Sequence, residues 1–191
     1  EEQGFDVITV SIGPVSSNWE RAVELYHQLK SGQVDYGKNH AEKFDVIQQP
    51  NGKNFIGLYP DWDYEHPVHL IGHSMGGQTI RMLDYLLENT IYVDSLNAQP
   101  EVSDLLGGIH SKWIKSISSI STPHNGTTYV DVRTKTMPFF QNFIGLAAVI
   151  GSDFYDFDLQ HWDLEQKEGE SWQDYYNRMD NHVAWESKNI S

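Results

Sequence analysis

The sequence of 191 residues contains no cysteine, so no disulfide bond stabilises it, which fits either the cytosol or secretion. It also lacks any run of about 18 apolar residues, which excludes a membrane-spanning helix. Positive charge is scarce: 13 Lys and Arg residues stand against 27 Asp and Glu, for a formal net charge of −14. Such a chain is not expected to bind nucleic acid or an anionic membrane by electrostatic attraction.

The composition predicts a single globular domain over residues 1–191. Hydrophobic residues make up 39% of the chain and aromatic residues 13%, which is too apolar for a disordered protein. The length is sufficient to bury a sizeable core. The sequence contains no internal repeat and no low-complexity tract.

The most informative motif is a G-x-S-x-G sequence at residues 72–76. The apolar run 68–71 before it predicts a buried strand, and apolar residues at helical spacing predict a helix after it. A serine at such a junction is typical of the nucleophile elbow of α/β-hydrolases, in which a sharp, strained turn exposes the hydroxyl. The two flanking glycines are expected to let neighbouring backbone pass close to this turn. We therefore predict that Ser74 is a nucleophile and that the Met75 backbone N–H donates to the oxyanion.

Further elements surround this motif. Residues 6–12 predict a strand, and a capping box formed by Ser17 and Glu20 predicts a helix from about residue 19 to residue 30. Residues 31–66 predict long connections with one short helix near His40. A second strand is predicted at 114–120.

The alternation of strands and helices predicts an α/β fold with a parallel sheet that helices cover on both faces. Ligands of such folds bind at the carboxyl ends of the strands, where Ser74 and Thr122 both fall. The nearly wholly apolar segment 137–150 is either a buried helix or a lid that opens on lipid. One more amphipathic helix is predicted from about Ser171 to Met179.

Five ordered stretches resemble the secreted bacterial lipases of the staphylococcal and thermophilic Bacillus/Geobacillus group. They are IGPVSSNWERA (12–22), VDYGKNHA (34–41), VHLIGHSMGGQTIRML (68–83), ISTPHNGT (120–127), and Tyr155-Asp156-Phe157 with His161-Trp162. The resemblance implies a partial α/β-hydrolase fold with a lid-like helical segment at 132–153. It further implies a serine ester hydrolase, most simply a triacylglycerol lipase, which acts on a lipid ester at an oil–water interface and is secreted.

The chain begins at Glu1 with no initiator methionine and no signal peptide, already well inside the family pattern. We therefore expect it to be an internal fragment of a longer protein. The resemblance places the family's calcium site, its triad acid and its triad histidine beyond Ser191, and the second oxyanion donor before Glu1. No cofactor is expected within the segment itself.

The segment nevertheless contains nine histidines. Chain order alone would allow His182 to act as the base, with an acid among Asp156, Asp158 and Asp163. For the other histidines near the motif we expect supporting roles. His73 is expected to pack against or orient the turn, His69 to be structural, and His124 to stabilise a turn.

The family also holds a zinc ion with two Asp and two His. The resemblance places these positions, in chain order, at Glu20, His40, Val46 and Gln160. Valine cannot bind a metal and glutamine is a poor zinc ligand, although His161 could in principle substitute. Glu20 also has a structural role as the capping-box residue. We therefore expect no zinc, with Glu20 and His40 as remnants of the site.

Two classes of function remain open. A hydrolase would use Ser74 and Met75, whether it is a lipase, a phospholipase or an acyltransferase. The alternative is a non-catalytic lipid- or partner-binding relic of the lipase fold, because the segment lacks a clear acid and base.

Overall fold

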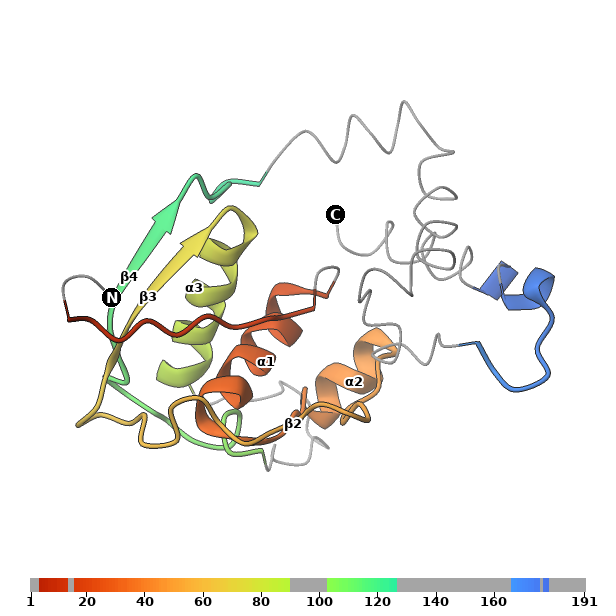
Figure 1. Cartoon of the computed structure of the whole chain (residues 1–191), viewed down its shortest axis with the longest axis horizontal. Coiled ribbons are helices and arrows are strands. Elements are labelled where there is room, and N and C mark those ends of the chain that lie inside the picture. Colours follow the sequence, from red (N-terminus) through yellow and green to blue (C-terminus); the bar gives the residue numbers. More distant parts are fainter. Residues whose placement is uncertain (1–3, 14–15, 90–102, 127–165, 176, 179–191) are drawn as a thin grey trace. The chain divides into compact units, whose positions relative to one another are not determined.

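The computed structural model of the chain describes residues 4–13, 16–89, 103–126, 166–175 and 177–178. The chain divides into two units, residues 1–124 and 125–191, and each is described by itself. The first unit contains α1 (Asn18–Lys30), β1 (Gly32–Gln33), α2 (Lys38–Phe44), β2 (Asn54–Phe55), β3 (Val68–His73), α3 (Met75–Glu88) and β4 (Ile114–Ile120) (Figure 1). None of the helices in these described ranges is long and apolar enough to cross a membrane.

Helix α1 begins with the predicted capping box. The Glu20 N–H donates to Ser17 Oγ at 3.3 Å, and the Ser17 N–H donates to Glu20 Oε2 at 2.6 Å. Two of the free donors at the helix start are thereby satisfied, and the prediction is confirmed.

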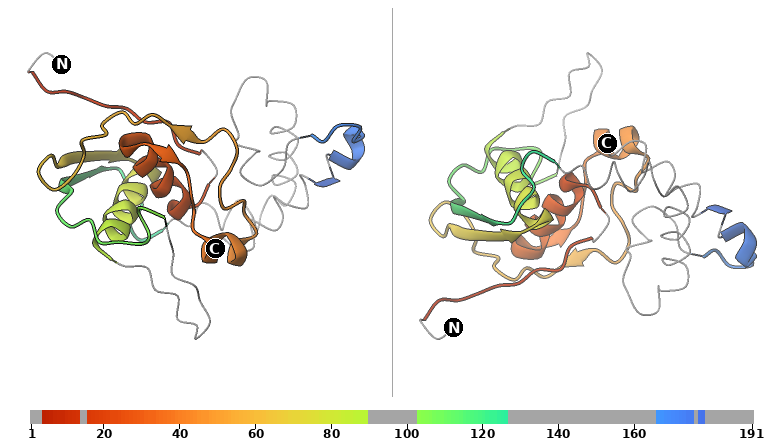
Figure 2. Two further views of the ribbon diagram at one scale, coloured as in Figure 1. Left: turned by 90° about the horizontal axis from the view of Figure 1, so that it is seen from below. Right: turned by 90° about the horizontal axis from the view of Figure 1, so that it is seen from above.

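Strands β3 and β4 form a parallel pair, with Leu70 opposite Ile117 and His73 opposite Ile120. This confirms both predicted strands and their direction. Helix α3 packs against both strands and α1 packs against α3 (Figures 1 and 2). The two faces of β3 differ, because Leu70 is 9% exposed and Ile71 is 72% exposed. Within the described residues α3 thus covers one face of this sheet, and helical cover on both faces remains a prediction.

The prediction of a strand at residues 6–12 is wrong, because this segment forms no strand and joins neither sheet. Side chains of α1 bind its backbone instead. The Ser11 N–H donates to Gln28 Oε1 at 3.0 Å, the Gln28 amide donates to the Ser11 carbonyl, and the Gly13 N–H donates to Glu24 Oε2 at 2.8 Å. Apolar composition predicts that a segment can form a strand, but not that a ladder partner is present.

The connection 31–66 contains the short helix predicted near His40, which is α2. It also contains a small antiparallel ladder, β1 with β2, that the sequence did not predict. Each of these strands is two residues long, too short to show an alternating pattern.

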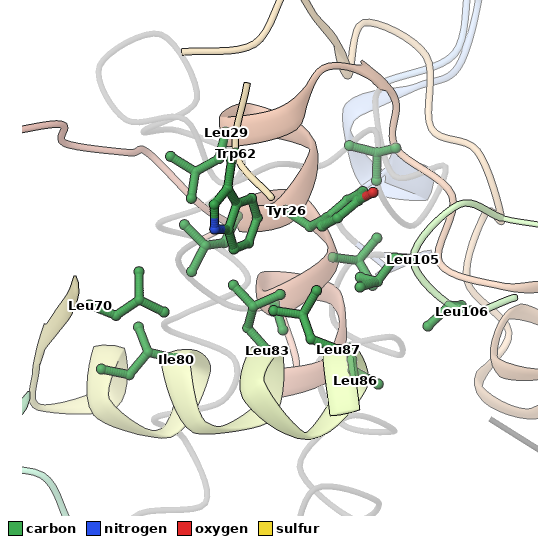
Figure 3. Packing of buried hydrophobic residues seen from close by; sticks show 14 of the residues in the cluster. Tyr26, Leu29, Trp62, Leu70, Ile80, Leu83, Leu86, Leu87, Leu105 and Leu106 are labelled. Carbon is green, nitrogen blue, oxygen red and sulfur yellow. The ribbon is translucent and has the colours of Figure 1, made fainter. Parts of the chain in front are cut away.

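The core of the first unit lies between α1 and α3. Figure 3 shows Tyr26 and Leu29 of α1 and Leu83 and Leu87 of α3 directed toward the space between the two helices, beside Trp62. The Trp62 indole N–H donates to the Trp113 carbonyl at 2.8 Å, so this large side chain is buried without an unpaired donor.

In the second unit, residues 172–175 and 177–178 are helical, as predicted. The Asp174 N–H donates to Ser171 Oγ at 3.2 Å, as at a helix N-cap. Arg178 makes a two-pronged ion pair with Glu170, and its hydrogen bond is the main cause that lowers the pKa of Glu170 to about 2. Tyr175 is buried, whereas Trp172 is 63% exposed. The candidate lid at 132–153 lies outside the described residues.

Core packing predicts that substitutions at two positions of α3 change the free energy of unfolding by very different amounts. Leu83 is 0% exposed and Tyr85 is 54% exposed. We expect Leu83→Ala to lower the free energy of unfolding by about 2–5 kcal/mol, because it removes buried methyl groups and leaves a cavity. Tyr85→Ala is the matched control and should change it by about 0.5 kcal/mol or less. Urea denaturation of both variants measures the difference, and equal midpoints would contradict this core.

Candidate active site

The candidate site is centred on the residue between β3 and α3. Ser74 has φ 52° and ψ −123°, outside the conformations that L residues favour, and its side chain is exposed. Such a backbone conformation costs about 1–3 kcal/mol and is common at active sites. The predicted sharp, strained turn at Ser74 is therefore present.

Hydrogen bonds hold the backbone on both sides of this turn. The Ser74 N–H donates to the Ile120 carbonyl at the end of β4, at 2.9 Å, and the Gly77 N–H donates to the Ser74 carbonyl at 3.1 Å. Among the described residues, no acceptor binds the Met75 N–H, which lies in the first turn of α3. Free N–H groups at a helix start favour a developing negative charge.

Close contacts with neighbouring atoms require glycine at two positions here, and only one of them belongs to the G-x-S-x-G motif. A Cβ on Gly72 would lie 2.5 Å from backbone atoms of Gly76, and one on Gly77 would lie 2.0 Å from Thr122 Oγ1. A Cβ on Gly76 would meet nothing within 4 Å. The expectation was thus right for Gly72 and wrong for Gly76. The second close approach is at Gly77, where the side chain of Thr122, two residues after β4, lies against the start of α3.

The loop after β4 is bound to α3 through side chains. The Gln78 amide donates to the Pro123 carbonyl at 2.7 Å, and Arg81 Nη1 donates to His124 Nδ1 at 2.9 Å. Since Arg81 can only donate, the His124 proton lies on Nε2, 2.9 Å from Ser119 Oγ. These contacts agree with the turn-stabilising role expected for His124. The Thr122 hydroxyl is buried beside Gly77 and has no hydrogen-bond partner within the described ranges.

No histidine of the described part acts on Ser74 by a hydrogen bond. His73, the last residue of β3, is exposed, while His69 Nδ1 lies 2.7 Å from Ser116 Oγ on the neighbouring strand. His69 thus has the structural contact expected of it. The other candidates, Asp156, Asp158, Asp163 and His182, lie outside the described residues.

The expected zinc remnants lie together between α1 and α2. His40 Nε2 is 2.5 Å from Glu20 Oε1, and the His40 ring stacks on Trp19 with centroids 5.1 Å apart. The second Glu20 oxygen accepts the Ser17 N–H. Val46 offers no ligand atom, and the described residues contain no group of three or more potential metal ligands. Gln160 and His161 lie outside the described residues. A four-ligand zinc site does not fit the residues described.

Comparison with known proteins identifies the relatives of this chain. The family model described as "Lipase-like, C-terminal domain" matches residues 1–191. A lipase of Staphylococcus epidermidis is 40% identical over 195 residues, which cover 98% of this chain and 28% of the relative. This confirms the resemblance to staphylococcal lipases.

Solved structures agree. The crystal structure of Staphylococcus hyicus lipase matches with a TM-score of 0.80 and 37% identity, over 96% of this chain and 48% of that chain. The structure of lipase 1 from Pelosinus fermentans matches with a TM-score of 0.72 and 40% identity, over 97% of this chain and 50% of that one. The chain therefore spans half or less of the length of each of these relatives.

Substitution by alanine should change the stability of the protein in opposite directions at the two glycines after Met75. In Gly76→Ala the new methyl group has open space, and the gain in helix propensity should stabilise the protein by up to about 1 kcal/mol. In Gly77→Ala the methyl group overlaps Thr122, and we expect a net loss of about 1–3 kcal/mol. Thermal unfolding measures both variants. A Gly77→Ala variant as stable as Gly76→Ala would contradict the close approach of the Thr122 side chain to Gly77.

Proposed function

Because the chain belongs to the family of lipase-like C-terminal domains, we propose that it is the nucleophile-bearing part of a carboxylic ester hydrolase, most simply a triacylglycerol lipase. The observation that carries this proposal is the strained, exposed Ser74 at the start of α3. An ordinary turn serine has no need of this conformation, whereas a nucleophile gains an exposed hydroxyl beside free backbone donors.

In the proposed reaction, Ser74 Oγ attacks the carbonyl carbon of the ester while its proton passes to a general base. The carbonyl oxygen becomes an oxyanion that accepts the Met75 N–H. Collapse of this intermediate expels the alcohol, which takes the proton from the base, and leaves an acyl group on Ser74. Water then attacks the acyl-enzyme in the same manner and releases the fatty acid.

The described residues supply the nucleophile and one oxyanion donor. We propose that the base, the acid that orients it and the second donor come from elsewhere in the protein. Lipid ester as substrate, secretion, a lid at 132–153 and helical cover on the second face of the sheet are proposed on the same family relationship. A phospholipase or acyltransferase would use the same two residues.

A second candidate function has one observation in its favour. Within the described ranges, neither a histidine nor a carboxylate hydrogen-bonds to Ser74. A protein that lacks a base altogether would be a non-catalytic domain that binds a lipid or another partner through the lipase fold.

Labelling of Ser74 distinguishes the two functions. The full-length protein is treated with an alkyl phosphonate in detergent, and the modified residue is identified by mass spectrometry. For a hydrolase we expect one label, on Ser74, because only an activated hydroxyl attacks phosphorus rapidly. Ser74→Ala should lose the label and ester hydrolysis together.

The matched control is Ser119→Ala, which removes a serine that bonds to His124 and should leave the label on Ser74. A folded wild-type protein that takes no label would overturn the hydrolase proposal and favour the binding domain.

We also propose that the protein has no zinc site at Glu20 and His40. Their direct contact and the valine at position 46 support this. Zinc at one hundred times its dissociation constant would stabilise a protein by about 2.7 kcal/mol. We therefore expect added zinc, or 1,10-phenanthroline to remove it, to leave the melting temperature of the full-length protein unchanged. A zinc-dependent rise that His40→Ala abolishes would show that a site exists.

A further inference from the structure

A buried hydrogen-bonded chain links α1 to the first turn of α3. Arg21 Nε donates to Thr79 Oγ1 at 3.1 Å, and the Thr79 hydroxyl donates to the Met75 carbonyl at 3.2 Å. Both side chains are buried, and Arg21 precedes Thr79 by 58 residues in the sequence. The chain thus connects a helix far away in sequence to the residue that follows Ser74.

The bond from Thr79 to Met75 alone would not be unusual. Threonine in a helix often donates to the carbonyl four residues earlier. What is unusual here is that the Thr79 hydroxyl also accepts a hydrogen bond from Arg21. A buried guanidinium needs fixed hydrogen-bond partners. Its Nη1 donates to the Gly13 carbonyl at 3.3 Å, so Arg21 is held by two separate segments.

This series of hydrogen bonds begins at the Arg21 cation and ends at the Met75 carbonyl. Burial lowers the pKa of Arg21, because it disfavours the charged guanidinium. The nearby Glu24 carboxylate acts in the opposite direction, because its negative charge favours the charged form. A hydroxyl that accepts from a cation becomes a stronger donor, here to the Met75 carbonyl. The Met75 N–H and the Met75 carbonyl lie in the two peptide planes that meet at the Met75 Cα, so holding the carbonyl limits how far the N–H can turn.

This series of hydrogen bonds holds the backbone after Ser74, while a separate contact holds the backbone before it. The Ser74 N–H is bound to Ile120, and Thr79 binds the backbone directly after Ser74. A strained residue persists only where its surroundings determine its conformation from both sides. Oxyanion donors act best when they are oriented before the reaction begins.

We propose that Arg21 and Thr79 are positioning residues, which orient the Met75 backbone so that its N–H meets the oxyanion formed at Ser74. The inference rests on the proposed hydrolase function. Neither side chain needs to touch the substrate, since both act through the Met75 carbonyl.

The test compares two substitutions of Thr79 in the full-length protein with a p-nitrophenyl ester as substrate. Thr79→Val keeps the shape and removes the hydroxyl, whereas Thr79→Ser keeps the hydroxyl. Rates are divided by the concentration of Ser74 that a phosphonate titrates, so that misfolded protein does not count. We expect kcat to fall about tenfold in Thr79→Val with KM nearly unchanged, and to stay within about threefold in Thr79→Ser. Loss of a whole oxyanion donor costs more, about 10²–10³.

Arg21→Lys is the second variant, in case Thr79→Val does not fold. It keeps the charge but cannot bind Thr79 and Gly13 as a guanidinium does, and we expect a similar fall in kcat. Wild-type kcat per titrated serine in Thr79→Val or Arg21→Lys would overturn this inference, as would equal losses in Thr79→Val and Thr79→Ser. A wild-type protein that takes no label and hydrolyses no ester would instead refute the proposed function.

Discussion

The hydrogen bond from the Ser74 N–H to the Ile120 carbonyl is the contact on which the site depends. It joins the end of β4 to the residue with the strained backbone, at 2.9 Å. Without it, the cost of about 1–3 kcal/mol for that conformation would favour a relaxed turn. The register of the two strands brings their ends level, since His73 lies opposite Ile120. Strand pairing, rather than any side chain of the motif, thus sets where Ser74 stands.

Buried charged side chains of α1 bind the segments that pack around this helix. Glu24 Oε1 accepts from the Tyr36 hydroxyl at 2.7 Å and from Lys53 Nζ at 2.9 Å, and its other oxygen accepts the Gly13 N–H. Arg21 binds the carbonyl of the same Gly13 residue. Buried charges contribute little net stability, but any packing that left them unpaired would be strongly disfavoured. The segment before α1 is therefore positioned by α1 side chains.

The features that the sequence predicted well are those encoded locally. The capping box, the strand 114–120, the short helix near His40 and the turn at Ser74 all depend on neighbouring residues. The features that the sequence predicted wrongly or did not predict depend on contacts between distant parts. Residues 6–12 have strand-forming side chains but no partner strand, and Gly77 is needed because Thr122 lies against it.

The contact between Arg21 and Thr79 is another feature that joins distant parts of the sequence and that local patterns do not predict. A helix pattern rich in buried positions can show that Arg21 faces inward, since it stands one turn before Leu25. It cannot show which element the guanidinium meets there. Sequence motifs for a nucleophile therefore identify the reacting residue more readily than the residues that hold it in place.

The geometry also bears on whether the fold is catalytic or a relic. A binding domain could relax Ser74 and lose the need for glycine at 72 and 77, because nothing would require an exposed hydroxyl. In this chain the strain and the two close approaches occur together with a Met75 N–H that no acceptor among the described residues binds. Each alone has a structural explanation, but their combination is what attack by Ser74 on a carbonyl requires. This supports the proposed hydrolase function, for which a base would have to come from outside the described part of the chain.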